Sequence, residues 1–295
     1  MRLPLPPRPS APPITNLAPV SRAFIFGYGF IGAAFAGLAR TAGLDLIATA
    51  RTADKRQALA AQGIDAVDPQ DPAALRQAAK AEVILITPAP DDDGCPAFRA
   101  LQCLIEGKPW IGYLSTTGVY GDRGGGWVFE DSDLDPSSAE GRRRVLAEHQ
   151  WLTKGAHLFR LPGLYGPGRN AIDRLRDGTA RRVRIDGHVF SRLHHDDCAT
   201  GLMASVARPN PGRAYNLCDD KPASADEVLI HAAELSGLAL PPLTAFDDLP
   251  ATAKRFYADN KRVSNARAKA ELGWRPLYPT YREGLDAIYR ASQTS

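Results

Sequence analysis

The sequence has little of what marks disulfide-rich, zinc-binding or membrane-embedded proteins. Its 295 residues include four cysteines, Cys95, Cys103, Cys198 and Cys218, whose spacing is neither that of a zinc site nor that of a disulfide scaffold. No apolar run approaches the ~18 residues of a membrane span. The net charge is only +3, which gives no reason to expect a nucleic acid or an anionic membrane as partner. We therefore expect reduced thiols and a cytoplasmic protein.

The N-terminus also lacks an apolar core. Residues 1–20 form a proline-rich segment, with seven prolines between Met1 and Pro19, which suits neither a helix nor a signal peptide. We expect a disordered, partly extended tail, whose Pro-x-x-Pro content could also dock a partner. Beyond it, an apolar content of 44% and a charged content of 23% are typical of a globular chain long enough for one large domain or two smaller ones.

What the sequence does have is a glycine-rich turn between a predicted strand, 23–26, and a predicted helix of small residues. In a Gly-x-Gly-x-x-Gly dinucleotide site the first glycine makes the tight turn, the second lets backbone approach the pyrophosphate, and the third lets the helix pack closely on the strand. The helix N-terminus adds free N–H groups for phosphate. The residues predicted to hold a dinucleotide here are Gly27, Gly29, Phe30, Ile31 and Gly32.

The end of the next predicted strand, 44–49, bears on which dinucleotide is bound. Sites for NAD usually place an acidic residue here for the ribose 2′-hydroxyl, whereas an arginine suits a 2′-phosphate. This strand is followed by Arg51, with Lys55 and Arg56 one turn on, and by no carboxylate. We predict NADP, with NAD possible and with Arg51 on the 2′-phosphate. Arg51 could also be one more solvated loop cation.

Strands and helices alternate through the following part of the chain. We expect helices over 55–62, 72–79 and 96–106, and strands over 64–67, 82–87 and 110–115. This alternation predicts an α/β fold with a Rossmann-type, doubly wound parallel sheet. Ligands of such sheets bind at the carboxyl ends of strands, so the loop containing Thr87, Pro88 and Ala89 joins the predicted cofactor site.

Five later segments carry motifs in a fixed order. They are Leu-Ser-Thr-Thr-Gly-Val-Tyr-Gly-Asp at 114–122, Arg-Leu-Pro-Gly-Leu-Tyr-Gly-Pro-Gly at 160–168, His-His-Asp-Asp-Cys-Ala at 194–199, Ala-Tyr-Asn-Leu at 214–217 and Leu-Gly-Trp-Arg-Pro at 272–276. With the glycine-rich turn, the set resembles the extended short-chain dehydrogenases/reductases, the family of the sugar-nucleotide epimerases and dehydratases. The resemblance covers residues 22 to about 289.

The resemblance implies an NAD(P)-binding Rossmann domain over 21–165 and a mainly substrate-binding, smaller C-terminal domain over 166–295, from which some segments return to the sheet. It also implies that Thr116 hydrogen-bonds the reacting substrate oxygen, and that Pro162 and Leu164 lie near the nicotinamide. A nucleotide sugar or similar anionic substrate and a homodimer are further implications.

Two other sets of polar residues are less diagnostic. His194, His195, Asp196 and Asp197 look like metal ligands, but adjacent residues diverge on a strand or helix, and we expect no metal. Four arginines lie in segments that flank the substrate in the resembling family, where guanidinium groups suit a diphosphate. These are Arg169, Arg182, Arg184 and Arg192.

One part of the family's pattern is missing. Its acid/base is a tyrosine, followed after four residues by a lysine and after four more by a glutamate. With Glu148 as that glutamate, Glu140 stands at the tyrosine position and Arg144 at the lysine position. A phenol has a reference pKa near ~10, whereas a carboxyl starts near ~4.3 and must be buried to carry a proton at neutral pH. Arginine cannot release a proton but can still bind ribose hydroxyls.

Three explanations follow from this departure. Glu140 could be the acid/base of a modified mechanism, or Tyr120, Tyr165 or His194 could supply the proton, or the chain could bind NADP without the usual chemistry. We predict an atypical NADP-dependent oxidoreductase or epimerase-like enzyme. Its candidate catalytic residues are Thr116, Glu140 and Arg144. The alternative is a non-catalytic NADP-binding sensor or scaffold.

Overall fold

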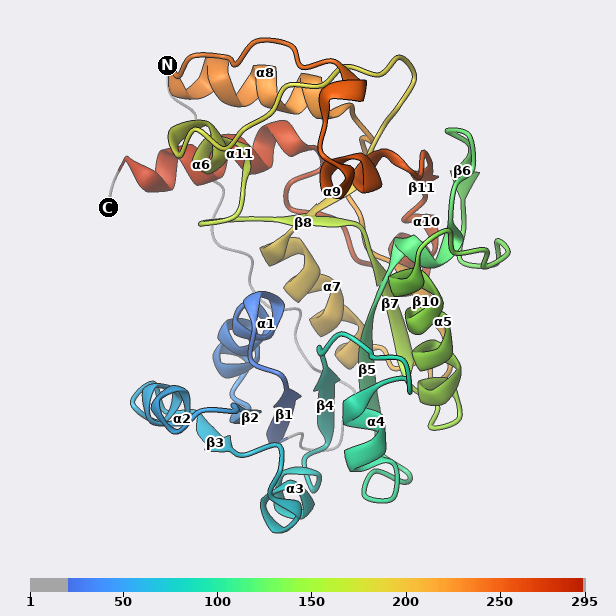
Figure 1. Ribbon diagram of the computed structural model, residues 1–295. Coiled ribbons are helices and arrows are strands. Elements are labelled where there is room, and N and C mark those ends of the chain that lie inside the picture. Colours follow the sequence, from blue (N-terminus) through green and yellow to red (C-terminus); the bar gives the residue numbers. More distant parts are fainter. Residues whose placement is uncertain (1–20, 294–295) are drawn as a thin grey trace.

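A computed structural model of the chain describes residues 21–293 and is built around one parallel sheet (Figure 1). The predicted tail, 1–20, lies outside the described residues. The strands lie in the order β10-β7-β5-β4-β1-β2-β3, and every neighbouring pair is parallel. Their bounds are β1 Arg22–Phe26, β2 Asp45–Thr49, β3 Asp65–Val67, β4 Val83–Ile86, β5 Trp110–Thr116, β7 His157–Leu161 and β10 Ala214–Asn216. The predicted doubly wound α/β class is confirmed.

Helices cover both faces of this sheet, which is why its central strands are apolar on both sides. In β1, Ala23 and Ile25 face one helical layer while Phe24 and Phe26 face the other. The first layer contains α1 (Phe30–Thr41), α2 (Ala53–Ala60) and α7 (His195–Ala207), and the second contains α3 (Pro72–Ala78), α4 (Pro96–Leu101) and α5 (Ala139–Leu152).

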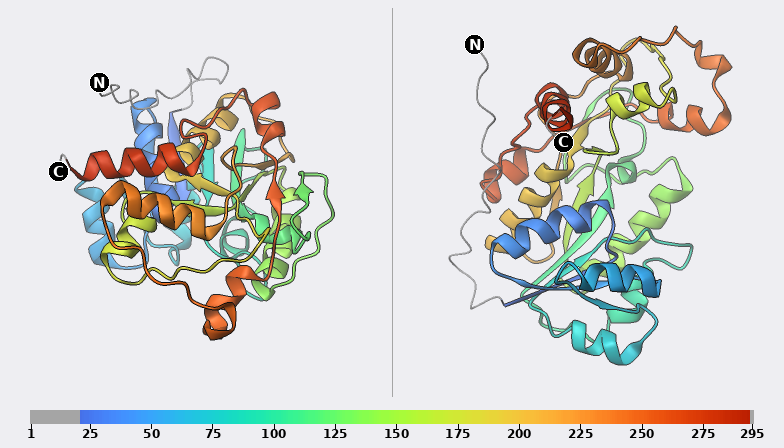
Figure 2. Two further views of the ribbon diagram at one scale, coloured as in Figure 1. Left: turned by 90° about the horizontal axis from the view of Figure 1, so that it is seen from above. Right: turned by 90° about the vertical axis from the view of Figure 1, so that its left-hand side faces the viewer.

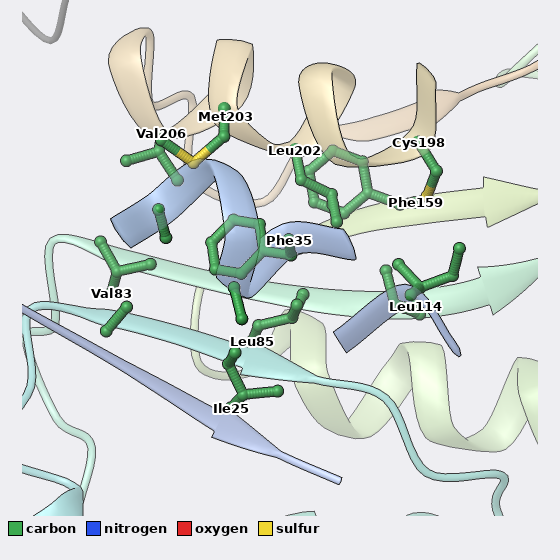
Figure 3. Packing of buried hydrophobic residues seen from close by; sticks show 14 of the residues in the cluster. Ile25, Phe35, Val83, Leu85, Leu114, Phe159, Cys198, Leu202, Met203 and Val206 are labelled. Atoms are coloured by element: carbon green, nitrogen blue, oxygen red, sulfur yellow. The ribbon is translucent and has the colours of Figure 1, made fainter. Parts of the chain in front are cut away.

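The layer containing α1 and α7 packs tightly on β1, which ends at the glycine-rich turn, and on the neighbouring strands β4, β5 and β7. Figure 3 shows Phe35 of α1 between the strands and the side chains of α7, with Leu202 and Met203 close by and Leu85 beneath. Phe35 and Leu85 are fully buried. This packing fixes the start of α1 relative to the ends of the central strands.

Two helices differ from the sequence-based expectation by more than one residue. Helix α2 covers Ala53–Ala60 rather than 55–62, and it begins earlier because the Thr52 hydroxyl caps it by accepting the N–H of Lys55. Helix α4 ends at Leu101 rather than at 106. The chain reverses through Gly107, which has a φ of 64°, before β5 begins, so a tighter turn replaces the last expected helical turn.

A second lobe lies beyond the carboxyl edge of the sheet, as Figure 1 and the right-hand view of Figure 2 show. Its helices α6 (Ala171–Arg176), α8 (Ala225–Ser236) and α11 (Tyr281–Ser292) share a small core that contains Ile172, Leu229 and Leu285. Helices α8 and α11 both begin with a capping box, which defines their first turns.

Short elements join the lobe to the sheet. They are the paired strands β8 (Gly163–Tyr165) and β9 (Arg192–His194), the paired strands β6 (Trp127–Val128) and β11 (Arg262–Val263), and helices α9 (Ala251–Lys254) and α10 (Ala266–Glu271). Within residues 21–293, no helix has the length and apolar character needed to cross a membrane.

Candidate functional site

A cavity of about 280 Å³ lies at the carboxyl edge of the sheet, between the glycine-rich turn and the ends of β4, β5 and β7. We call it the first cavity. Most of its lining was selected from the sequence: Gly29, Phe30, Ile31, Gly32, Thr87, Thr116, Arg144, Pro162 and Leu164. Leu114, Ser115 and Leu161 complete the lining. Five other selected residues lie outside it: Gly27, Arg51, Pro88, Ala89 and Glu140.

The turn before α1 is held from both sides at its first glycine. The Gly27 N–H donates to Thr49 Oγ1 at 2.8 Å, and Thr87 Oγ1 donates to Gly27 O at 2.5 Å. Gly27 has a φ of 94°, and a Cβ there would lie 2.5 Å from Thr87 Oγ1. The position therefore needs glycine for its backbone conformation and for space.

The other two glycines of the turn differ in their surroundings. A Cβ on Gly32 would lie 3.0 Å from Gly27 O and 3.2 Å from Ile25 Cγ2, so this glycine allows α1 to lie close to β1. A Cβ on Gly29 would have no heavy atom within 4 Å, although Gly29 lines the first cavity. Packing therefore does not explain Gly29, whereas close approach of a ligand to the backbone would.

Two cations lie beside this turn at the end of β2. Arg51 is exposed, and Lys55 Nζ donates to Tyr28 O at 2.8 Å. Arg56 is engaged elsewhere, because its guanidinium donates to Ala50 O and pairs with Asp68 at 3.0 Å. Arg51 and Lys55 are thus the basic groups placed to meet an anion at this end of the site.

Thr116 and Arg144 present donors to the first cavity. Thr116 Oγ1 accepts the N–H of Gly118 at 3.1 Å, which leaves its hydroxyl hydrogen free to be donated elsewhere. Arg144 Nη1 donates to Leu114 O at 2.6 Å and to Tyr113 Oη at 3.1 Å. These bonds anchor one nitrogen of the guanidinium, and its other N–H groups have no acceptor in the described part of the chain.

A buried ion pair holds α5 in position one turn beyond Arg144. The Glu148 carboxylate accepts hydrogen bonds from Ser115 Oγ at 2.6 Å and from Arg160 Nη2 at 2.8 Å. Both charged side chains are buried. Sequence reasoning used Glu148 only to align the motif and missed this link, because its partners lie on β5 and β7.

Glu140 lies at the exposed start of α5, one turn before Arg144. Its carboxylate is outside the lining of the first cavity. Nothing in this geometry supports its assignment as the acid/base, which stays a prediction.

The three other proposed proton sources also lie outside the first cavity. The Tyr120 hydroxyl donates to Asn216 Oδ1 at 2.7 Å, and burial raises its pKa to about 12. Burial also raises the pKa of Tyr165. His194 Nδ1 accepts the N–H of Asp196, and burial lowers the pKa of His194 to about 3. Among the lining residues, Arg144 is the single ionisable side chain.

The possible metal ligands do lie near one another. His194, His195 and Asp196 each offer a ligand atom, and these atoms lie within 4.8 Å of one another. However, His194 Nδ1 already accepts a backbone N–H. Asp197 has a structural role, because its carboxylate accepts the N–H groups of Leu277 and Tyr278.

A second cavity, of about 640 Å³, adjoins the first. Leu164 lines both cavities, and the Arg169 guanidinium lies 5.6 Å from the centre of the Phe30 ring. Arg192 also lines the second cavity. Arg182 and Arg184 do not line it, and both pair with Asp226 at 2.7 Å. Two lining arginines that sequence reasoning missed are Arg174 and Arg181.

Comparison with known proteins places this arrangement among related structures, although no family model matches the chain. A functionally unknown conserved protein from Silicibacter pomeroyi DSS is 43% identical, with a TM-score of 0.84 over 92% of this chain and 99% of that one. A dTDP-glucose 4,6-dehydratase from Bacillus anthracis, solved in complex with NAD, is 18% identical, with a TM-score of 0.75 over 93% and 97% of the two chains. The structural neighbours include members of the NAD-dependent epimerase/dehydratase family.

A curated relative gives a shorter match. The 3-diazoavenalumate denitrifying reductase of a Streptomyces species is 32% identical over 160 residues, which is 48% of this chain and 51% of the reductase. The chain spans about half the length of the curated relatives it matches.

Proposed function

We propose that this chain, which belongs to the same family as the functionally unknown conserved protein of Silicibacter pomeroyi, is an NAD(P)-dependent oxidoreductase of the atypical extended short-chain class. The observation that carries the proposal is the first cavity, which joins the glycine-rich turn to Thr116, Arg144 and the loop 162–164. The dehydratase of the same fold that was solved with NAD supports it. So does the relative named as a reductase.

The described residues fit a dinucleotide. Gly29 leaves open space where a Cβ would project, and Phe30, Ile31 and Gly32 line the cavity as the first three residues of α1. Their N–H groups precede the first intrahelical bonds and suit a pyrophosphate. The free N–H groups of Arg144 suit ribose hydroxyls. A bound nicotinamide would supply the hydride.

The protein's own contribution to the chemistry would be orientation and charge. The Thr116 hydroxyl would donate to a substrate oxygen, and the permanent charge of Arg144 would favour negative charge on that oxygen. Because the lining contains no carboxyl, imidazole or phenol, we infer that water supplies the proton. This chemistry suits reduction better than the proton transfers of an epimerase.

The cations at the end of β2 support a preference for NADP. The guanidinium of the exposed Arg51 has no ion-pair or hydrogen-bond partner in the described part of the chain, and Lys55 Nζ donates to Tyr28 O in the turn. Titration with NADPH and NADH should show tighter binding of NADPH, and R51E should weaken NADPH binding by about tenfold. The control R76E makes the same charge change on α3 and should have no effect. Equal affinities for NADPH and NADH would contradict the 2′-phosphate assignment.

A second function, a non-catalytic NADP sensor, is favoured by one observation: Arg144 is the single ionisable group that lines the first cavity. Incubating the protein with C4-deuterated NADPH and a panel of nucleotide sugars and carbonyl acids separates the two functions. Deuterium in a product identifies an oxidoreductase. Tight NADPH binding without transfer to any member of a broad panel favours the sensor.

The resemblance to the extended short-chain family underlies the assembly that we propose, and the cysteine content, the low net charge and the lack of long apolar runs underlie the proposed location and partners. We propose a homodimer in the cytoplasm, without a nucleic-acid or membrane partner. Sedimentation equilibrium of the intact chain tests the assembly, and a monomer at all concentrations would contradict it.

A further inference from the structure

The second cavity carries a surplus of positive charge, because its lining contains four arginines and two carboxylates, those of Asp173 and Asp177. Arg169, Arg174 and Arg181 line it, and none of these guanidinium groups has an ion-pair or hydrogen-bond partner among residues 21–293. By contrast, the neighbouring Arg182 and Arg184 both pair with Asp226. The cavity therefore keeps arginines whose donors are available to an anion.

Arg192 adds to this surplus from within the wall. Its Nη1 donates to Phe190 O at 2.9 Å and to Ala223 O at 2.8 Å, so its donors are taken up by uncharged carbonyl groups. Burial lowers the pKa of Arg192, although the nearby charge of Asp219 opposes this shift. Arg174 is exposed where it lines the cavity.

Of the uncharged polar side chains of the wall, the hydroxyls of Tyr165 and Tyr281 are buried without a hydrogen-bond partner in the described part of the chain, and those of Asn170, Thr179 and Ser191 are engaged. The Asn170 amide donates to Gly166 O and its oxygen accepts two N–H groups. Thr179 Oγ1 donates to Arg174 O, and Ser191 Oγ accepts the N–H of Val263. Few neutral groups therefore remain for the many hydroxyls of a sugar.

Much of the rest of the wall is apolar and partly aromatic. Phe190 and Tyr257 meet edge to face with their ring centres 5.5 Å apart, and Val228 and Leu249 are buried beside the cavity. Phe256 is 75% exposed although it lines the cavity. A large apolar side chain at this exposure gains free energy when an apolar ligand covers it.

We propose that the second cavity binds an organic anion with an apolar, aromatic-sized body, such as an aryl carboxylate, in preference to a nucleotide sugar. The free arginines hold the charged end and the apolar wall covers the body. The cavity adjoins the first one at Leu164, so such a ligand can extend toward Thr116. This inference rests on the proposed function for the identity of the cavity as the substrate site.

The test is calorimetric titration of the intact protein, saturated with NADPH, with four probes. Cinnamate has both a carboxylate and an aromatic group, cinnamamide has the aromatic group without the charge, and acetate has the carboxylate without the aromatic group. UDP-glucose is a nucleotide sugar. We expect cinnamate to bind at least about tenfold more tightly than each of the others. Tighter binding of UDP-glucose, equal binding of cinnamamide, or binding of none of the probes would overturn the inference.

Variants connect the binding to this cavity. R174Q and F256S should each weaken cinnamate binding by about fivefold to tenfold. R290Q is the control, because Arg290 is exposed on α11, a helix that also borders the cavity, and is outside the lining. Equal effects of R174Q and R290Q would place the binding elsewhere and overturn the inference.

A separate titration with NADPH distinguishes failure of this inference from failure of the proposed function. If NADPH binds but cinnamate does not, the inference fails and the proposed cofactor site stands. If NADPH itself does not bind, the proposed function fails. Thermal unfolding of each variant shows whether a lost affinity reflects a lost fold.

Discussion

At the scale of single residues, the ion pair of Glu148 with Arg160 is the interaction on which the position of α5 depends. Both side chains are buried, and removing one partner leaves an uncompensated charge in the interior. We expect E148Q to lower the free energy of unfolding by about 3 kcal/mol, measured by urea denaturation. The control E106Q removes an exposed pair with Lys154 and should cost less than about 1 kcal/mol. Similar losses in the two variants would contradict the structural role.

Arg144 stands where the family that this chain resembles has a lysine, and it still offers N–H donors to the first cavity. Because its free N–H groups line the first cavity, R144M should weaken NADPH binding by about tenfold. Fluorescence titration measures this. The control is R142M, since Arg142 is exposed on the same helix and outside the lining. If both variants bind NADPH as the unmodified chain does, Arg144 is not a cofactor ligand.

At the scale of elements, two glycines of the turn from β1 into α1 have different roles: Gly32 allows close packing, whereas Gly29 leaves space for a ligand. G32A places a methyl group against Gly27 O and Ile25, so it should cost about 1–3 kcal/mol of stability and also weaken NADPH binding. The added methyl group of G29A meets no protein atom. Alanine is a poorer N-cap of α1 than glycine, but it also restricts the unfolded chain, and these two effects offset each other. The free energy of unfolding should therefore change by less than about 1 kcal/mol.

The discriminating measurement is NADPH affinity in these two variants. If the backbone at Gly29 lies against the pyrophosphate, G29A should weaken NADPH binding by at least about tenfold while its urea midpoint stays near that of the unmodified chain. A G29A protein that binds NADPH normally would mean that the cofactor does not approach this turn closely.

Elements with a local pattern were predictable from the sequence, and those without one were not. The strand expected over 82–87 is Val83–Ile86 and the helix expected over 72–79 is Pro72–Ala78, because a continuous apolar run and an aspartate–proline start identify them. Two-residue strands such as Trp127–Val128 have no such period. The sequence alone also could not show that Arg181 lines the second cavity whereas Arg182 is paired, because the partner of Arg182 lies 44 residues away on α8.

At the scale of the whole molecule, buried carboxyl groups couple the fold to pH. Burial raises the pKa of Asp197 to about 7 and that of Asp219 to about 8, the latter in spite of the nearby charge of Arg192. Unfolded, such groups titrate near ~3.9. Between these values the folded chain holds protons that the unfolded chain has released. The stabilisation is therefore complete below about pH 4 and is lost as the pH rises toward 7 and 8.

The substitution D219N tests this coupling, because an amide keeps the shape and cannot ionise. We expect the stability of D219N relative to the unmodified chain to rise between about pH 5 and about pH 9, as the unmodified chain is forced to ionise a buried carboxyl. Urea denaturation at both pH values measures the difference. A relative stability that stays constant or falls would show that Asp219 is not protonated in the folded state.

The matched control is D226N, because the pKa of the Asp226 carboxyl is lowered whereas that of Asp219 is raised. Burial opposes ionisation of Asp226, but hydrogen bonds from Arg182 and Arg184 outweigh it and hold the pKa of Asp226 below its usual range. Its contribution is lost only as the pH falls through that lower value. D226N should therefore be destabilised to the same extent at about pH 5 and about pH 9, so a pH-dependent difference confined to D219N assigns the coupling to the raised carboxyl.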